Sequence, residues 1–414
     1  MLIRVKVKDV RVGVHVERVV GSWIDHPFWR SSFLIKDQAT LLRLTESRIE
    51  EVWIDVVQGI DPREGLTDTP PPETPQSATG QPATSQPGAG PVPVSSRPGR
   101  KPAQVSLADE AERAQLLREK GRQVVERIMK DARMGHMHAD EGTALVGDIY
   151  ESIQRNHDAF VSVARIKAAA DYTYLHSVSV CALMILLAQQ LSMSRDQICA
   201  AGLAGLLHDV GKAAIPLNLL HKPSALSEAE FAVVRGHPAA GAAILRQSGT
   251  LAPEVIDVCL HHHERIDGKG YPDRLSDEQI SVFAKMGAVC DVYDAITSDR
   301  PYKRAFSAAE AMRRMAAETA SHFDESIFKS FVKCVGLYPV GSVVRLASDR
   351  LAVVLQQNED ELLYPLVRMF YSINAKCRIM PELVDLTKSR DRIVSHEDPL
   401  KWGLTHTERL WREF

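Results

Sequence analysis

The sequence predicts a mostly α-helical protein, in which a helical bundle lies between a β-rich N-terminal domain and a short C-terminal extension that contains β-strands. Three observations support this prediction. Apolar and polar residues alternate over the first segment, apolar residues recur at helical spacing from about residue 142 to 337, and short β-prone runs return after Pro339. Each pattern is typical of its element, because side chains repeat with period two on strands and 3.6 on helices.

The N-terminal segment carries two alternating runs. Ile3, Val5 and Val7 alternate with polar residues, and a second run over 10–16 follows a change of parity at residues 8–9. Such alternation indicates half-buried strands joined by a turn or bulge. We therefore expect a β-rich domain at residues 1–60. Pro, Gly, Ser, Thr and Gln dominate residues 61–104, and such a stretch cannot bury enough apolar surface to become ordered, so it is expected to be a flexible linker.

The predicted helical bundle covers residues 105–337. Ser106 followed by Asp109 resembles a helix N-cap, and Ser227 with Glu230 forms a second capping pattern. Short β-runs at 343–346, 351–355 and 366–370 indicate the C-terminal extension, which is assigned to residues 338–414. Beyond about residue 376 the tail is polar and its pattern predicts no element.

Composition excludes several classes of protein. Lys+Arg total 50 against 53 Asp+Glu, so the net charge of -3 gives no support to binding of duplex nucleic acid. The longest apolar run, residues 178–188, is too short for a membrane span and is expected to be a buried core helix. Charges interrupt the N-terminus, which is not a secretory signal, and the six cysteines form no CxxC pair. A cytoplasmic protein is expected.

Histidines and aspartates spread along the helical region carry the predicted chemistry. His208 and Asp209 are adjacent, and each of the histidine-bearing segments has an apolar face beside its polar residue. This combination places imidazoles and carboxylates at the edge of a helical core, where metal sites of helical proteins are built. Imidazole with carboxylate suits Fe, Mn, Zn or similar divalent ions, and paired ions clamp both the attacking and leaving oxygens of a phosphodiester. Residues 261–263 are three consecutive histidines, and three neighbouring side chains cannot all point at one site. His261 is therefore left out of the candidate metal ligands.

Four motifs together resemble the HD-GYP subgroup of the HD phosphohydrolases. They are HDVGK at 208–212, HHE at 262–264, DGKGYP at 267–272 and DVYDA at 291–295, and the resemblance covers about residues 172–335. SWIDHPFW at 22–29, with the Pro-rich linker after it, resembles a small accessory domain found before HD-GYP domains in bacteria. The resemblance implies an HD-type helical bundle and a metal-dependent phosphodiesterase that hydrolyses the second messenger cyclic di-GMP to linear pGpG, often onward to GMP.

The resemblance also implies roles for individual residues. The metal ligands would be His176, His208, Asp209, His237, His262, His263 and Asp291. Asp209 and Lys212 would be catalytic, with Lys212 contacting the scissile phosphate or supporting the transition state as a point charge. Substrate would also contact a group formed by Gly268, Gly270, Tyr271, Pro272, Arg300 and Lys303. An ordinary turn at 268–272 is the alternative for that loop.

One position departs from the family pattern. Members with three metals carry a Glu four residues before the first metal-ligating His, and here Tyr172 stands there. A tyrosine is a poorer ligand, so we expect a two-metal centre. Two alternatives stay open: an HD phosphohydrolase for other nucleotides or another cyclic dinucleotide, and a weakly catalytic receptor of cyclic dinucleotide that signals through its N-terminal domain. Protein partners of that domain and a homodimer also stay open.

Overall fold

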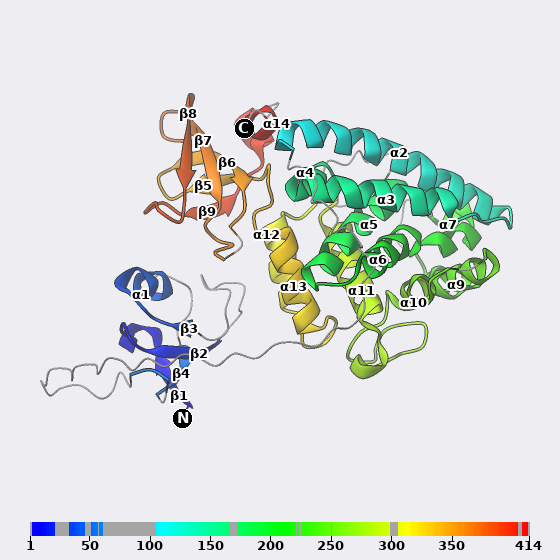
Figure 1. Ribbon diagram of the computed structural model, residues 1–414, viewed down its shortest axis with the longest axis horizontal. Coiled ribbons are helices and arrows are strands. Elements are labelled where there is room, and N and C mark those ends of the chain that lie inside the picture. The colour runs from blue at the N-terminus through cyan, green and yellow to red at the C-terminus, as the bar shows by residue number, and fades with distance from the viewer. Residues whose placement is uncertain are drawn as a thin grey trace, which may run out of the picture. The chain divides into compact units, whose positions relative to one another are not determined.

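The computed structural model describes residues 2–20, 33–45, 51–56, 58–60, 105–164, 172–220, 222, 226–249, 251–298, 305–358, 360–404 and 408–412. The chain divides into two compact units. The described residues up to 60 belong to the first unit, and those from 105 onward belong to the second. Figure 1 shows the strands of the first unit in blue and the helices and the second sheet of the second unit in cyan to red.

The N-terminal unit is built on a four-stranded antiparallel sheet of order β1-β4-β2-β3. Its elements are β1 (Leu2–Lys6), η1 (Val7–Asp9), β2 (His15–Val20), β3 (Phe33–Leu34), α1 (Gln38–Thr45) and β4 (Glu51–Asp55). Val16, Val52 and Ile54 are fully buried on one face of this sheet, and Leu44 of α1 is buried as well. The predicted β-rich character is confirmed.

The second strand of this sheet begins later than the alternating valines predict. Residues 7–9 form a 3-10 turn, in which the Val10 N–H donates to the Val7 carbonyl at 3.1 Å. The Val14 N–H likewise donates to the Arg11 carbonyl at 3.2 Å. The amides of Val10 and Val14 bond locally rather than across a ladder, so the strand expected over 10–16 begins only at His15 and continues to Val20.

The second unit is mainly helical, as predicted. Its helices are α2 (Leu107–Arg133), α3 (Asp140–Arg155), α4 (His157–Ala164), α5 (Tyr172–Gln190), α6 (Arg195–Leu207), η4 (Val210–Ala214), α7 (Leu217–Leu220), α8 (Glu228–Val234), α9 (His237–Gln247), α10 (Pro253–His261), η5 (Asp277–Gln279), α11 (Val282–Ile296), α12 (Ala308–Ala316) and α13 (Glu325–Val335). The predicted caps are present. Ser106 accepts from the Asp109 N–H at 3.2 Å, and Ser227 and Glu230 form a reciprocal capping box.

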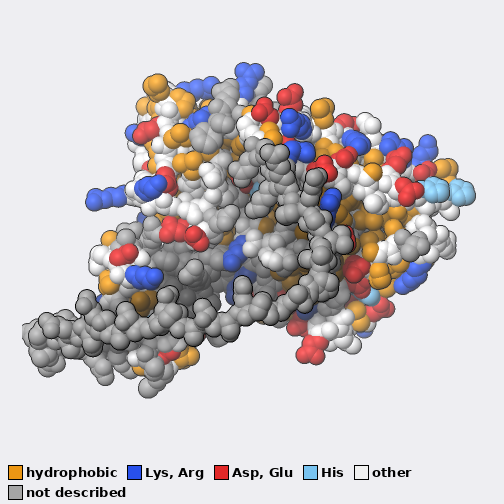
Figure 2. Space-filling view, viewed as in Figure 1, with side chains coloured by type: hydrophobic (Ala, Val, Ile, Leu, Met, Phe, Trp, Pro, Cys, Tyr) orange, Lys and Arg blue, Asp and Glu red, His pale blue; other side chains and the backbone are white. Residues whose placement is uncertain are grey.

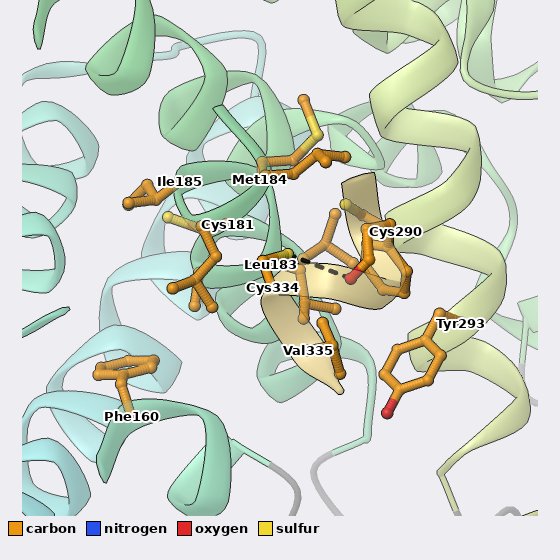
Figure 3. Close-up of a cluster of buried hydrophobic side chains, with 14 of the residues drawn as sticks. Phe160, Cys181, Leu183, Met184, Ile185, Cys290, Tyr293, Cys334 and Val335 are labelled. Carbon is orange, nitrogen blue, oxygen red and sulfur yellow. Dashed lines mark hydrogen bonds between the residues drawn. The ribbon is translucent and has the colours of Figure 1, made fainter. Parts of the chain in front are cut away.

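Helix α5 is the centre of this unit. By length and composition it could cross a membrane, but 78% of the window Thr173–Gln190 is buried inside the protein, as expected of a core helix. Figure 3 shows Cys181, Met184 and Ile185 of α5 beside Cys290 of α11 and Cys334 of α13. The middle of α5 is thereby packed against α11 and α13, which positions the polar residues described below.

A five-stranded antiparallel sheet of order β8-β7-β6-β5-β9 follows the helices. Its elements are β5 (Val343–Leu346), β6 (Arg350–Gln356), β7 (Leu366–Ser372), β8 (Cys377–Asp385), β9 (Ile393–His396), η6 (Pro399–Trp402) and α14 (Glu408–Arg412). Three strands match the predicted β-runs. The pattern beyond residue 376 predicted no strand, yet β8 and β9 lie there. Both are edge strands, and β8 is so exposed that Met380 keeps 90% of its surface accessible, which removes the alternation that marks a half-buried strand.

Surface charge follows the balanced composition. In Figure 2, blue and red side chains are interspersed over the visible described surface, as expected for 50 basic and 53 acidic residues. The domain boundaries at 60, 104 and 337 stay predictions.

Candidate metal centre

The candidate metal residues lie on or next to five helices, four of which contribute them at or near a helix end. His176 is in the first turns of α5, His208 and Asp209 follow α6, and His237 begins α9. His262 and His263 follow α10, and Asp291 is on α11. All but His263 are buried, with exposed fractions between 1% and 9%. Four helix ends and the middle of α11 therefore bring residues that are up to 115 positions apart in sequence into one cluster.

The Asp209 carboxylate lies between two sets of imidazoles. Its Oδ2 is 3.3 Å from Nε2 of His208 and 3.8 Å from Nε2 of His176. Its Oδ1 is 3.3 Å from Nε2 of His237 and 3.9 Å from Nε2 of His262. A carboxylate placed in this way can give one oxygen to each of two cations.

Asp291 completes one of the two sets. Its Oδ1 is 3.0 Å from Nε2 of His176 and 3.9 Å from Nε2 of His208. Its Oδ2 is 3.9 Å from Nδ1 of His263. The second set is made by His237, His262 and His263, whose ligand atoms lie within 4.8 Å of one another. His176, His208 and Asp291 meet the same criterion, and so do His208, Asp209 and His262.

Hydrogen bonds fix which nitrogen each imidazole presents. Nδ1 of His208 lies 2.7 Å from the Gly205 carbonyl, and Nδ1 of His237 lies 2.7 Å from the Val234 carbonyl. Nδ1 of His262 lies 3.0 Å from the Val258 carbonyl. A carbonyl only accepts, so each Nδ1 carries its proton and each Nε2 keeps its lone pair. All three Nε2 atoms therefore face the cluster with a lone pair that can be donated to a metal ion, and the backbone sets their orientation.

The cluster holds polar atoms that protein groups leave unsatisfied. Among the described residues, Nε2 of His208 and Oδ1 of Asp209 are buried without a hydrogen-bond partner. Burying such atoms unpaired costs free energy, and buried charges are ordinarily paired or coordinate metals. Neutral imidazole and carboxylate are also the donor types that first-row divalent ions take. The residues present therefore fit divalent cations.

Electrostatics favour the ligating protonation states at most of these residues. Burial, reinforced by neighbouring imidazoles, lowers the pKa of His262 well below its usual range and that of His263 to about 4. Burial works to raise the pKa of Asp209, but Lys212, His208 and His237 together outweigh it and hold that pKa well below its usual range. His176 differs, because burial opposes its charge while Asp291 and Asp294 raise its pKa to about 9.

Lys212 lies at the edge of the cluster. Its Nζ is 2.5 Å from Oδ2 of Asp209, one turn earlier in the chain. The side chain keeps 27% of its surface accessible, in contrast to the 5% of Asp209. Lys212 therefore brings a positive charge from the solvent side to the buried carboxylate, where an anionic substrate would arrive.

The loop at 264–275 is held by one buried carboxylate. Oε1 of Glu264 accepts from the N–H groups of Asp273 and Arg274 at 2.7 and 3.0 Å, and Oε2 accepts from that of Leu275 at 3.1 Å. A side chain at Gly270 would put Cβ 2.5 Å from the backbone of Glu264, so only glycine fits there. Both contacts fold the loop back onto the end of α10.

This loop places Tyr271 against the cluster. The Tyr271 ring lies 4.7 Å from that of His263, with the planes 31° apart, and the Tyr271 N–H donates to the His263 carbonyl at 3.3 Å. Gly268 turns the loop with φ +70, and Pro272 follows Tyr271. The segment 268–272 is thus next to the imidazoles rather than remote from them.

Two of the predicted substrate residues cannot be placed. Arg300 and Lys303 lie outside the described residues, and so does the side chain of Tyr172.

His261, which the sequence analysis left out of the metal ligands, bonds Asp257 at 2.7 Å and Asp273 at 3.1 Å through its two nitrogens. Both of its nitrogens are therefore engaged by these carboxylates.

Gly211 and Asp294 are two further residues that help to build the cluster. A Cβ on Gly211 would come within 1.9 Å of the His237 carbonyl, so glycine lets η4 approach the start of α9. Oδ2 of Asp294 lies 2.6 Å from Nδ1 of His176. In the sequence, these two roles are indicated by the glycine of HDVGK and the second aspartate of DVYDA.

Comparison with known proteins gives consistent matches. Residues 153–327 match the model of the HD domain family, and residues 2–141 match a domain of unknown function. A cyclic di-GMP phosphodiesterase of Pseudomonas aeruginosa is 47% identical over 416 residues, which cover 99% of this chain and 96% of that protein. A cyclic di-GMP phosphodiesterase response regulator of Xanthomonas campestris is 41% identical over 34% of this chain and 37% of its own length.

Among solved structures, an HDG"Y"P protein from Bdellovibrio bacteriovorus aligns with a TM-score of 0.46 at 17% identity. The alignment covers 80% of this chain and 98% of that one.

Proposed function

The chain belongs to the HD-GYP family of cyclic di-GMP phosphodiesterases, and from that premise we propose that it hydrolyses cyclic di-GMP to linear pGpG. The observation that carries the proposal is the position of Asp209, whose two oxygens each face a different pair of imidazoles. A buried carboxylate between two donor sets is the arrangement that a binuclear phosphodiesterase needs.

The proposed ligands divide between two cations. His176, His208 and Asp291 would hold one ion, His237, His262 and His263 would hold the other, and Asp209 would bridge them. When bound, two such cations supply Lewis-acid stabilisation of the phosphodiester oxygens and lower the pKa of the attacking water. Two ions rather than three are proposed because Tyr172 stands where a third site would need a carboxylate. Fe, Mn and Zn all suit this donor set.

The chain's own residues would bind and orient the substrate. Lys212 offers three donors and a point charge beside Asp209, which suits the scissile phosphate. Tyr271, held against His263 by the Gly268–Pro272 loop, would form one wall of the pocket. Arg300 and Lys303 are proposed as contacts to a phosphate or a guanine. Onward cleavage of pGpG to GMP would use the same cluster.

A cytoplasmic location is part of the proposal. All six cysteines are free, and burial raises the pKa of Cys334 to about 12, so that this thiol stays protonated and inert. Free thiols suit a reducing compartment. The domain limits at 60, 104 and 337 are retained, with residues 1–60 as the candidate surface for protein partners.

The decisive experiment is anaerobic purification with metal quantification, followed by a cyclic di-GMP turnover assay. We expect release of pGpG that is abolished by chelator and by Asp209→Ala. A metal-loaded wild-type protein that binds cyclic di-GMP without cleaving it would overturn the proposal in favour of a receptor. Preferential cleavage of another cyclic dinucleotide in a substrate panel would change the assigned substrate.

A further inference from the structure

Arg235 connects two segments at the edge of the metal cluster. It follows α8 and stands two residues before His237. Its guanidinium carbon is 4.5 Å from the Phe231 ring centre, a contact one helical turn away. The same carbon is 5.4 Å from the Tyr271 ring centre, on the loop after α10. The second contact spans 36 residues of sequence, so the tertiary fold and not local helix geometry creates it.

The position of Arg235 is fixed relative to the proposed ligands on both sides. On its own turn, the Val234 carbonyl bonds Nδ1 of His237 at 2.7 Å. Across the gap, the Tyr271 ring that Arg235 contacts packs 4.7 Å from the ring of His263. One aromatic ring therefore separates the guanidinium from an imidazole of the cluster. Arg235 itself is exposed, so its N–H groups are accessible from solvent.

The charge of Arg235 is not neutralised within the described part of the chain. No described carboxylate lies within 4.0 Å of its guanidinium, and the nearby acidic residue of α8, Glu230, is bound by Lys222 at 2.8 Å. Stacking on an aromatic ring holds a guanidinium plane while leaving the N–H fork at its edge free. Such a fork binds a phosphate or carboxylate in bidentate geometry.

We propose that Arg235 binds the phosphodiester of cyclic di-GMP that is not being cleaved, an inference that rests on the proposed function. The substrate carries two phosphodiester anions, and the metal cluster takes one of them. The second anion then needs a cation at the rim, and Arg235 is held there by Tyr271. A guanine edge also accepts an arginine fork, but a charged acceptor bonds about twice as strongly as a neutral one, which favours the phosphate.

The test compares Arg235→Gln and Arg235→Lys with a matched control, Arg127→Gln, on α2. Arg127 is also an exposed arginine, and it pairs with Glu141 at 2.8 Å. R235Q is expected to raise KM for cyclic di-GMP by about 10- to 100-fold, the range for hydrogen bonds to a charged group. R235K, which keeps the charge without the fork, should lie between R235Q and wild type. R127Q should match wild type.

Two readouts separate the phosphate from other roles. The inhibition constant of cyclic di-AMP, which has the same two phosphodiesters, should rise by the same factor in R235Q. A cyclic di-AMP inhibition constant that is unchanged in R235Q while KM for cyclic di-GMP rises would mean that Arg235 reads guanine, and it would overturn the proposal. Metal content should be unchanged, and loss of metal in R235Q would mean that Arg235 is structural. An unaltered KM for cyclic di-GMP in R235Q would also refute the proposal.

Failure of the proposed function would look different. If the wild-type protein does not cleave cyclic di-GMP, the dissociation constant of cyclic di-GMP for the metal-loaded protein replaces KM. R235Q should then weaken binding by the same factor, and equal binding by wild type and R235Q would refute the role of Arg235.

Discussion

Oδ2 of Asp294 lies 2.6 Å from Nδ1 of His176, and this contact leaves Nε2 of His176 turned toward Asp291 at 3.0 Å. Both aspartates are on α11, one turn apart, so a single helix provides a proposed ligand and the group that orients another. Carboxylates that bond the second nitrogen of a ligating histidine fix its orientation and raise its basicity.

Asp294→Asn should therefore weaken metal binding without removing a ligand. The expected loss is about 10- to 100-fold in metal affinity, the range for such orienting groups. The measurement is competition with a chelator of known affinity, read by metal analysis. Asp148→Asn is the control, because that exposed carboxylate of α3 pairs with Lys120 of α2 at 2.7 Å and belongs to none of the groups of the cluster. Equal affinities in D294N and D148N would contradict the orienting role.

A second prediction concerns the bridging position. Because each Asp209 oxygen faces a different set of imidazoles, Asp209→Asn should empty both sites, whereas His237→Ala should empty only one. Metal analysis of the two purified variants distinguishes these outcomes, with the wild type at about two ions per chain as expected for a binuclear centre. Retention of a full complement by D209N would exclude a bridging carboxylate.

The fold was largely predictable, because helical spacing and caps are local properties. Ser106 and Ser227 cap the helices that their sequence patterns indicate. The errors fell where local pattern is weakest. In β8, exposure of both faces removes alternation, and the amides of Val10 and Val14 bond within turns although the valines alternate. Edge strands depend on a neighbouring strand that sequence order alone does not identify.

Less of the candidate site could be predicted from the sequence. The motifs indicated which histidines and aspartates gather, and the structure brings His208, Asp209 and His237 within contact distance. The groups that orient His208 and His237 were not predictable. They are the backbone carbonyls of Gly205 and Val234, and every residue has such a carbonyl, so the sequence does not indicate which of them bond an imidazole. The contact of Arg235 with Tyr271 likewise depends on tertiary packing between segments that have no local relation.

A third prediction concerns the loop that carries Tyr271. Glu264 is buried and accepts three backbone N–H groups of residues 273–275. Glu264→Gln removes the negative charge and turns an amide NH2 toward these donors, so the loop should loosen. Losing a hydrogen bond to a charged acceptor costs about 1.5–3 kcal/mol, so KM for cyclic di-GMP should rise about tenfold or more. Metal content should stay unchanged, as should KM in the control Glu141→Gln. Loss of metal in E264Q would show instead that Glu264 supports the ligands.

A fourth prediction concerns stability and pH at the start of α2. Glu110 is fully buried, accepts from Ser152 at 2.7 Å, and receives Arg155 at 2.8 and 2.9 Å. Burial works to raise the pKa of Glu110, but Arg155 and Ser152 outweigh it and bring that pKa below its usual 4.5. A carboxylate whose pKa is lower in the folded state stabilises the fold above its unfolded pKa, and this contribution is lost as pH falls through the folded pKa.

Glu110→Gln should therefore cost about 2 kcal/mol of unfolding free energy at pH 7, the scale for hydrogen bonds to a charged group. The difference between wild type and E110Q should shrink as pH falls below 4.5, because the wild-type carboxyl then becomes protonated and resembles the amide. Urea unfolding of both proteins, followed by circular dichroism at matched pH values, measures this difference in unfolding free energy. Comparing the two at the same pH cancels the effects of metal loss and of other titrating groups. A difference that grows toward low pH would reverse the assigned sign and show that Glu110 is bound as the neutral acid.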